Sequence, residues 1–195
     1  MIQSLQELIE FFEAQAVAEP ELADDLRLDR PGLGDADEAR LRAELPLLPD
    51  SYFEVARRVD LSGKSIGYIR LTPPNRGDVV SALIDANKTP ANPFLDRLRS
   101  EQVTEVGSVE GDPLVLGPAG DEVRLLIHDR PALSLRRVAS SFEILVLLAG
   151  NLEQAMLSSE ELSEAGSEFE KVITSLEPNP EAREWWSEYS EMYLS

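Results

Sequence analysis

The segment LRRVASSFEILVLLAGNLEQAM, Leu135–Met156, contains the most apolar run in the chain and constrains the fold more than any other part of it. The apolar stretch itself, Phe142–Leu152, has eleven residues and includes Glu143 and Asn151. Because a membrane-spanning helix needs about 20 predominantly apolar residues, this stretch is too short to cross a bilayer. It therefore predicts a buried helix in a soluble domain.

A serine and a glutamate mark where this helix should begin. Ser140 is followed three residues later by Glu143, which is the spacing of a capping box, in which each side chain bonds the other residue's backbone N–H. The helix is predicted to run from Ser140 to about Met156. Because its first half is apolar on nearly every side, we expect other elements to enclose it and the domain core to form around it.

Apolar periodicity and turn residues predict further helices and strands on either side of this segment. The expected helices lie at about residues 5–19, 21–28, 38–45, 51–59, 77–88, 92–102, 159–176 and from 180 onward, and the expected strands at 66–74, 103–109, 112–117 and 122–129. This order favours an α+β fold over alternating βαβ units. We expect a small mixed or antiparallel sheet packed against several helices, with helical N- and C-terminal extensions.

The charge of the chain is strongly negative and unevenly distributed. The formal net charge is −19, of which residues 1–60 carry −9, residues 61–150 carry −1 and residues 151–195 carry −9. Such a surface repels phosphate backbones and anionic bilayers, so direct binding to nucleic acid or to a membrane is not expected. It attracts basic proteins, although acidity that serves only solubility is the alternative.

The sequence offers little material for catalysis. Cysteine is absent, and His128, beside Asp129 at the end of an apolar strand, is the single histidine. The segment SGKS at residues 62–65 lacks the upstream glycine of a phosphate-binding loop, because Arg58 stands at that position. We expect no catalytic residue, no metal and no cofactor, and keep open a hydrolase that uses His128 with carboxylates.

The last helix is rich in aromatic residues that share neighbouring faces. Trp185, Trp186 and Tyr189 are spaced to form either an exposed patch for a partner or a second copy of the chain, or anchors that dock the helix on the domain itself. Carboxylates of the last two helices are further candidate contacts for a partner, and the alternative for each is a solvated helix face. They are Glu160, Glu161, Glu164, Glu168, Glu184 and Glu188.

Several short motifs occur together in one order within residues 111–150. They are Gly111-Asp112, the apolar runs Leu114–Leu116 and Val123–Ile127, His128-Asp129, and Ala139-Ser140-Ser141-Phe142-Glu143. With LPLLPDSYFEVARRV upstream, residues 45–59, this pattern resembles the SUKH superfamily, which includes the Smi/Knr-type cell-wall-assembly regulators and bacterial immunity proteins. The resemblance implies one SUKH-like domain over residues 1–195, with its core at about 40–155, an acidic helical N-terminal segment 1–39 and an acidic helical C-terminal extension 156–195.

The resemblance implies protein binding rather than catalysis. We expect a cytoplasmic immunity-type protein, since the N-terminal residues lack the basic and apolar regions of a secretion signal. Its expected partner is a cognate bacterial toxin or another basic protein, in particular a nuclease, whose active site it covers. The alternative is a regulatory or scaffold domain that binds proteins without neutralising a toxin, and a homodimer is compatible with either.

Overall fold

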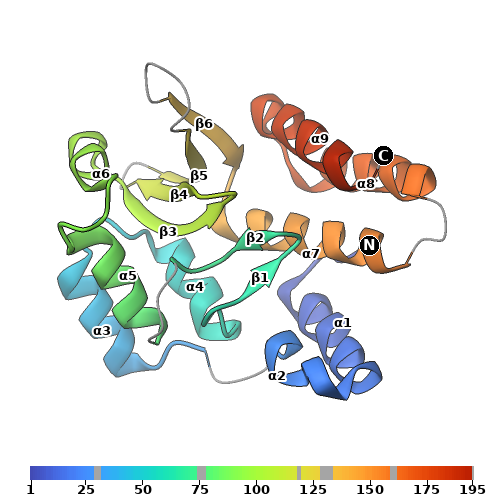
Figure 1. The fold of residues 1–195 in the computed structure, drawn as a ribbon, viewed down its shortest axis with the longest axis horizontal. Coiled ribbons are helices and arrows are strands. Elements are labelled where there is room, and N and C mark those ends of the chain that lie inside the picture. The colour runs from blue at the N-terminus through green and yellow to red at the C-terminus, as the bar shows by residue number, and fades with distance from the viewer. Residues whose placement is uncertain (29–31, 74–77, 118–119, 128–133, 159–161, 195) are drawn as a thin grey trace.

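The computed structural model of this protein describes residues 1–28, 32–73, 78–117, 120–127, 134–158 and 162–194. Within these ranges, six strands form one antiparallel sheet in which sequence neighbours are also spatial neighbours, from β1 to β6. Helices lie at both ends of the chain and between β2 and β3 (Figure 1). The fold is α+β with an antiparallel sheet, which confirms the class predicted from the sequence.

The elements have the following bounds. The helices are α1 (Leu5–Ala18), the 3₁₀ turn η1 (Pro20–Leu22), α2 (Ala23–Leu26), α3 (Asp35–Glu44), α4 (Asp50–Arg58), α5 (Val79–Lys88), α6 (Leu95–Glu101), α7 (Phe142–Ser158), α8 (Leu162–Leu176) and α9 (Pro180–Leu194). The strands are β1 (Ser65–Ile66), β2 (Ile69–Arg70), β3 (Thr104–Val109), β4 (Asp112–Gly117), β5 (Gly120–Ile127) and β6 (Ser134–Ala139).

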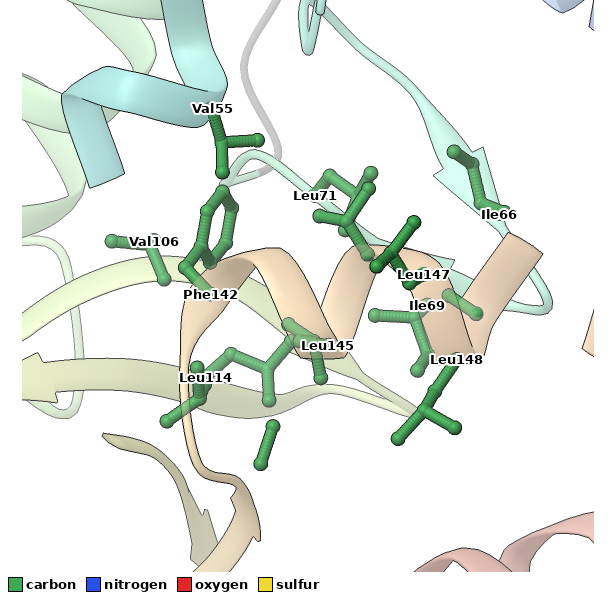
Figure 2. Packing of buried hydrophobic residues seen from close by; sticks show 14 of the residues in the cluster. Val55, Ile66, Ile69, Leu71, Val106, Leu114, Phe142, Leu145, Leu147 and Leu148 are labelled. Carbon is green, nitrogen blue, oxygen red and sulfur yellow. The ribbon is translucent and has the colours of Figure 1, made fainter. Parts of the chain in front are cut away.

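Helix α7 occupies the centre of the core, as its apolar sequence predicts. Phe142, Leu145 and Leu148 have no solvent-exposed surface. In Figure 2, Phe142 lies between Val55 of α4 and Val106 of β3, and its ring contacts Tyr52 with a centroid distance of 4.9 Å. Burial of each such side chain contributes about 1.5–3 kcal/mol to the hydrophobic free energy of folding, so this helix organises the elements around it.

The start of α7 differs from the predicted capping box. The helix begins at Phe142, and its cap is Ser141, whose Oγ accepts a hydrogen bond from the Ile144 N–H at 3.2 Å. Ser140 instead donates its backbone N–H (2.8 Å) and its hydroxyl to the buried carboxylate of Glu177. The prediction of a Ser140–Glu143 box is therefore wrong, because strand β6 continues to Ala139 and delays the helix.

Two strand predictions need correction. Residues 134–139 form the edge strand β6, which the sequence analysis did not anticipate, because two arginines and no alternating apolar pattern occupy them. The single strand expected at 66–74 is a hairpin of two short strands, β1 and β2, because Gly67 and Tyr68 form a tight turn with φ angles of 55° and 61°. The β1–β2 hairpin positions part of the cleft described below.

The terminal helices pack on the same core as the sheet. One hydrophobic cluster runs from Ile2 to Leu194 and includes residues of α1, α7, α8 and α9. At the start of the chain, the Asn151 side chain accepts from the Ile2 N–H and donates to the Ile2 carbonyl, both at 2.8 Å. The acidic N- and C-terminal segments are thus packed against the centre of the fold rather than appended to it.

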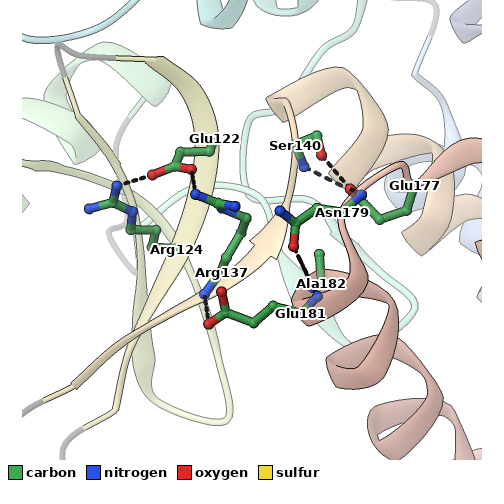
Figure 3. A network of polar contacts seen from close by, with 8 residues as sticks. All are labelled: Glu122, Arg124, Arg137, Ser140, Glu177, Asn179, Glu181 and Ala182. Atoms are coloured by element: carbon green, nitrogen blue, oxygen red, sulfur yellow. Dashed lines mark hydrogen bonds and ion pairs between the residues drawn. The ribbon is translucent and has the colours of Figure 1, made fainter.

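Helix α9 covers the open edge of β6 with polar contacts (Figure 3). The indole Nε1 of Trp186 donates to the Val138 carbonyl at 2.8 Å, and the Arg137 N–H donates to Glu181 at 3.3 Å. Asn179 caps the helix, since its side chain accepts from the Ala182 N–H at 3.2 Å. An exposed strand edge invites pairing with other chains, and α9 removes that opportunity here.

No helix in the described ranges is both long enough and apolar enough to cross a membrane.

Candidate functional site

The outer face of the sheet, opposite α7, carries an open cleft of about 720 Å³. It lies over β2–β4 and is bounded by the C-terminal end of α5 and the segment that leads into α6. Its lining residues are Ser65, Tyr68, Arg70, Pro73, Ala82, Asp85, Ala86, Thr89, Ala91, Asn92, Pro93, Phe94, Glu105, Ser108, Glu110, Gly111 and Pro113. Below, "the cleft" means this set of residues.

Strand register explains why polar side chains gather on this face. Arg70 pairs with Ser108, and Glu105 pairs with Val115. Directly paired residues project from the same side of a sheet. Val115 projects toward Leu98 of α6 in a small apolar cluster separate from the main core, so Glu105 also faces outward. Helix α6 covers one part of the outer face and leaves the cleft beside it.

The backbone of Glu105 is held by an asparagine instead of by a neighbouring strand. Strand β2 pairs with β3 only at Ser108 and Val109, which leaves the β3 edge unpaired near Glu105. The Asn87 side chain of α5 fills this place, since its Oδ1 accepts from the Glu105 N–H at 2.8 Å and its Nδ2 donates to the Glu105 carbonyl at 2.9 Å. This arrangement fixes the position from which the Glu105 side chain enters the cleft.

A second asparagine orients the Glu105 carboxyl group. Asn92 donates to Glu105 Oε2 at 2.9 Å and to the Ala86 carbonyl at 2.6 Å, while its own Oδ1 accepts from the Phe94 N–H at 2.8 Å. Glu105 Oε1 accepts no hydrogen bond from any residue in the described ranges. One carboxyl oxygen is thus held in place, and the other remains available to a ligand.

Burial gives this carboxyl group an unusual pKa. Glu105 is 6% exposed, and removal of its charged form from water raises its pKa to about 7, against a smaller opposing effect of the Asn92 hydrogen bond. A buried carboxylate without a cationic partner costs free energy, and such groups concentrate at functional sites. The cleft therefore contains a group that a bound cation would stabilise.

Tyr68 forms an exposed aromatic rim beside the cleft. Its side chain is 62% exposed, and its ring stacks on Tyr193 of α9 at a centroid distance of 4.6 Å and an interplanar angle of 17°. Its φ of 61° lies in the left-handed region, which is costly for a bulky residue. Backbone strain of this kind persists only where the surrounding structure imposes it, and it occurs often at binding sites.

The turn that presents Tyr68 is clamped by two helices. The Gly67 N–H donates to Glu153 of α7 at 2.8 Å, and the Gly67 carbonyl accepts from the Tyr189 hydroxyl at 3.3 Å. A Cβ atom at Gly67 would lie 2.7 Å from the Ala149 carbonyl oxygen, so only glycine allows this close approach. These contacts fix the backbone of the turn, and the Tyr193 ring supports one face of the Tyr68 side chain.

The charged side chains that line the cleft are predominantly acidic. Among the described lining residues, the three carboxylates of Asp85, Glu105 and Glu110 outnumber the one guanidinium, that of Arg70. The Glu110 carboxylate also accepts from the Tyr193 hydroxyl at 3.4 Å, which connects it to the aromatic rim. A surface that combines carboxylates with a tyrosine ring suits a cationic side chain, which can form charge-assisted hydrogen bonds and pack on the ring face.

The carboxylates predicted from the sequence lie away from this cleft. Glu164 and Glu168 are exposed on α8, where Glu168 pairs with Lys171, and Glu184 and Glu188 are exposed on α9, where Glu188 pairs with Arg136 at 2.7 Å. Glu160 and Glu161 lie outside the described residues. None of the four described carboxylates lines the cleft.

The predicted aromatic patch requires correction. Trp185, Trp186 and Tyr189 are 6%, 0% and 3% exposed, respectively. They pack on one another, with Trp185 and Tyr189 stacked at 4.8 Å, and they anchor α9 to the core and to β6. The alternative of intramolecular docking describes these residues, and little of their surface is left for a partner.

Sequence reasoning missed both Tyr68 and Glu105. One signal was present for Tyr68, since Gly67-Tyr68 within an apolar run of β character suggests a turn. No comparable signal exists for Glu105, because its burial depends on Asn87 and Asn92, which reach it from outside the strand. His128 and Asp129, considered for acid–base chemistry, lie outside the described residues.

Among the residues that the structure describes, no three carboxylate or imidazole groups are placed to hold a metal ion together. Comparison of the chain with protein-family models, with curated proteins and with solved structures gives no match.

Proposed function

We propose that this protein is a non-catalytic binding protein that neutralises a basic bacterial toxin, such as a nuclease, in the cytoplasm by covering the toxin's active site. The observation that carries the proposal is the cleft, whose described lining contains three carboxylates and one guanidinium together with an exposed tyrosine. The resemblance of residues 111–150 to SUKH immunity proteins points in the same direction.

Electrostatics supports a basic partner. A net charge of −19 on 195 residues creates a strongly negative surface potential, which accelerates the encounter with a positively charged protein. A nuclease must bind phosphate and therefore presents a basic active site that an acidic protein fits. The exposed carboxylates of α8 and α9 contribute to this field, and they extend the acidic surface beyond the cleft.

A growth-rescue experiment tests the proposal. Toxin-like genes adjacent to the gene of this protein are expressed in a bacterial host with and without the protein, and growth is scored together with co-purification of the two chains. We expect one such toxin to arrest growth and the protein to restore it through a stable complex. If no neighbouring product binds the protein or is neutralised by it, the proposal is wrong.

The same experiment separates this function from a regulatory or scaffold role. A neutralising protein must abolish the activity of the purified toxin at a molar ratio near that of the complex. A chain that binds a neighbouring protein tightly but leaves its activity unchanged would instead be a scaffold or regulatory domain.

A further inference from the structure

The cleft differs from an ordinary acidic surface because one of its carboxyl groups is buried and held in place. Glu105 is 94% buried, its backbone is fixed by Asn87, and its Oε2 is fixed by Asn92. Solvated carboxylates such as Glu184 lack such support and gain little from a neighbouring cation. A cation at Glu105 Oε1 would instead offset a desolvation cost that the folded chain already bears.

We propose that the cleft binds a short segment of the partner protein in which one arginine or lysine side chain bonds Glu105 and a neighbouring residue of the same segment packs against Tyr68. This inference rests on the proposed function, and it identifies the chemical group by which the partner is recognised.

The size of the cleft fits a peptide segment rather than a single ion. Its volume of about 720 Å³ lies within the range of roughly 300–1,000 Å³ found for sites that enclose drug-sized molecules. A single basic side chain leaves room for neighbouring residues of the same segment. Arg70 on the floor offers N–H donors to backbone carbonyls of that segment, since Arg70 forms no ion pair with a described residue.

Tyr68 supplies the apolar part of the recognition. Exposed aromatic residues with a fixed orientation dominate the binding energy at protein interfaces, because little conformational entropy is lost when they are covered. The clamped turn and the stacked Tyr193 ring hold Tyr68 in place before any partner arrives.

Titration of the ¹⁵N-labelled full-length protein with short capped peptides tests the inference by NMR. The probes are Gly-Ala-Xaa-Ala-Gly peptides in which Xaa is arginine, lysine or citrulline, the last matching arginine in shape but not in charge. We expect the arginine and lysine peptides to shift the amide signals of Tyr68, Glu105 and Ser108 in a saturable manner. We expect the citrulline peptide to bind at least about tenfold more weakly, because it forms no charge-assisted hydrogen bond.

Variants then assign the contacts. Glu105→Gln keeps the hydrogen-bond acceptor for Asn92 and should lower the affinity for the arginine peptide about tenfold or more. Tyr68→Ala, at an exposed position, should lower the same affinity about fivefold or more. Glu184→Gln, the matched control on α9, should leave the affinity unchanged. The dispersion of each variant's spectrum reports whether it is folded.

Several results would overturn the inference. One is equal affinity for the arginine and citrulline peptides, and another is a set of amide chemical-shift changes that map to α8 and α9. Peptide binding that is undiminished in both Glu105→Gln and Tyr68→Ala would also contradict it, as would tighter binding of spermidine than of the peptides. Failure of the inference is distinguishable from failure of the proposed function. If Glu105→Gln and Tyr68→Ala neutralise the toxin fully, the cleft inference falls and the function stands, whereas peptide binding in the cleft without any neutralised toxin contradicts the function alone.

Discussion

At the scale of single residues, Glu105 shows how a fold creates a property that its sequence does not display. The residue is one of 37 acidic residues, and its neighbours in the chain are unremarkable in composition. Two asparagines from another segment hold it in a place where water reaches it poorly, and the pKa rises to about 7 as a result. Its role in binding follows from this placement.

The raised pKa of Glu105 predicts a specific dependence of stability on pH. Between pH 4.5 and about 7 the folded chain keeps this proton and the unfolded chain has lost it, so the free energy of unfolding should fall as pH rises through this window. The ionisation of Glu105 changes the free energy of unfolding by about 3 kcal/mol at most over this range. Glu105→Gln should remove this part of the slope in urea denaturation measured between pH 4.5 and 8.

Other charges at the cleft titrate or act nearby, so the variant needs a comparison. Arg70, Asp85 and Glu110 line the same cleft and remain in Glu105→Gln. Glu184→Gln, on the exposed face of α9, should retain the wild-type pH slope. An unchanged slope in Glu105→Gln would show that the carboxyl group is already ionised in the folded chain near pH 5.

At the scale of elements, the β1–β2 turn depends on a glycine for two separate reasons. Gly67 has a φ of 55°, and a Cβ atom there would approach the Ala149 carbonyl oxygen to 2.7 Å. Gly67→Ala should lower the free energy of unfolding by about 1–3 kcal/mol, measured by chemical denaturation. Gly63→Ala separates the two causes, because Gly63 also has a positive φ (67°) but nothing within 4 Å of an added Cβ. A loss in Gly63→Ala equal to that in Gly67→Ala would contradict a role for the contact with α7.

The docking of α9 on β6 makes a second prediction at this scale. Trp186→Phe removes the hydrogen bond to the Val138 carbonyl and leaves that buried acceptor unpaired in a space too large for the phenyl ring. The free energy of unfolding should fall by about 2–4 kcal/mol in thermal or urea denaturation. Met192→Ala on the same helix, where Met192 is 57% exposed, should change it by less than about 0.5 kcal/mol. Similar effects of the two substitutions would argue against tight docking of this helix.

At the scale of the whole molecule, the net charge of −19 should govern the rate at which a basic partner binds. Raising the salt concentration from about 50 to 500 mM shortens the Debye length several-fold, so the association rate constant should fall at least about tenfold. Stopped-flow mixing with the purified toxin measures this rate. The dissociation rate should change much less, and an association rate independent of salt would remove the electrostatic argument for a basic partner.

Local patterns in the sequence are sufficient to predict the α+β class, the central helix and most element positions. Periodicity and capping depend on a few neighbouring residues, so they can be recognised in the sequence. The apolar run Phe142–Leu152 predicts a buried helix, and Asn179 is the type of residue that caps a helix such as α9. The acidic ends are equally visible, because net charge is a property of composition.

Packing between distant segments determines which side chains are buried and which are exposed. Residue types such as those of Trp185, Trp186 and Tyr189 are common in binding patches. In this fold the three side chains are instead buried against the core and the edge of β6. Tyr68 is exposed because α7 and α9 clamp the turn before it, and Glu105 is buried because α5 and the segment after it close over β3. These outcomes depend on contacts between segments far apart in the chain, and no local pattern encodes them.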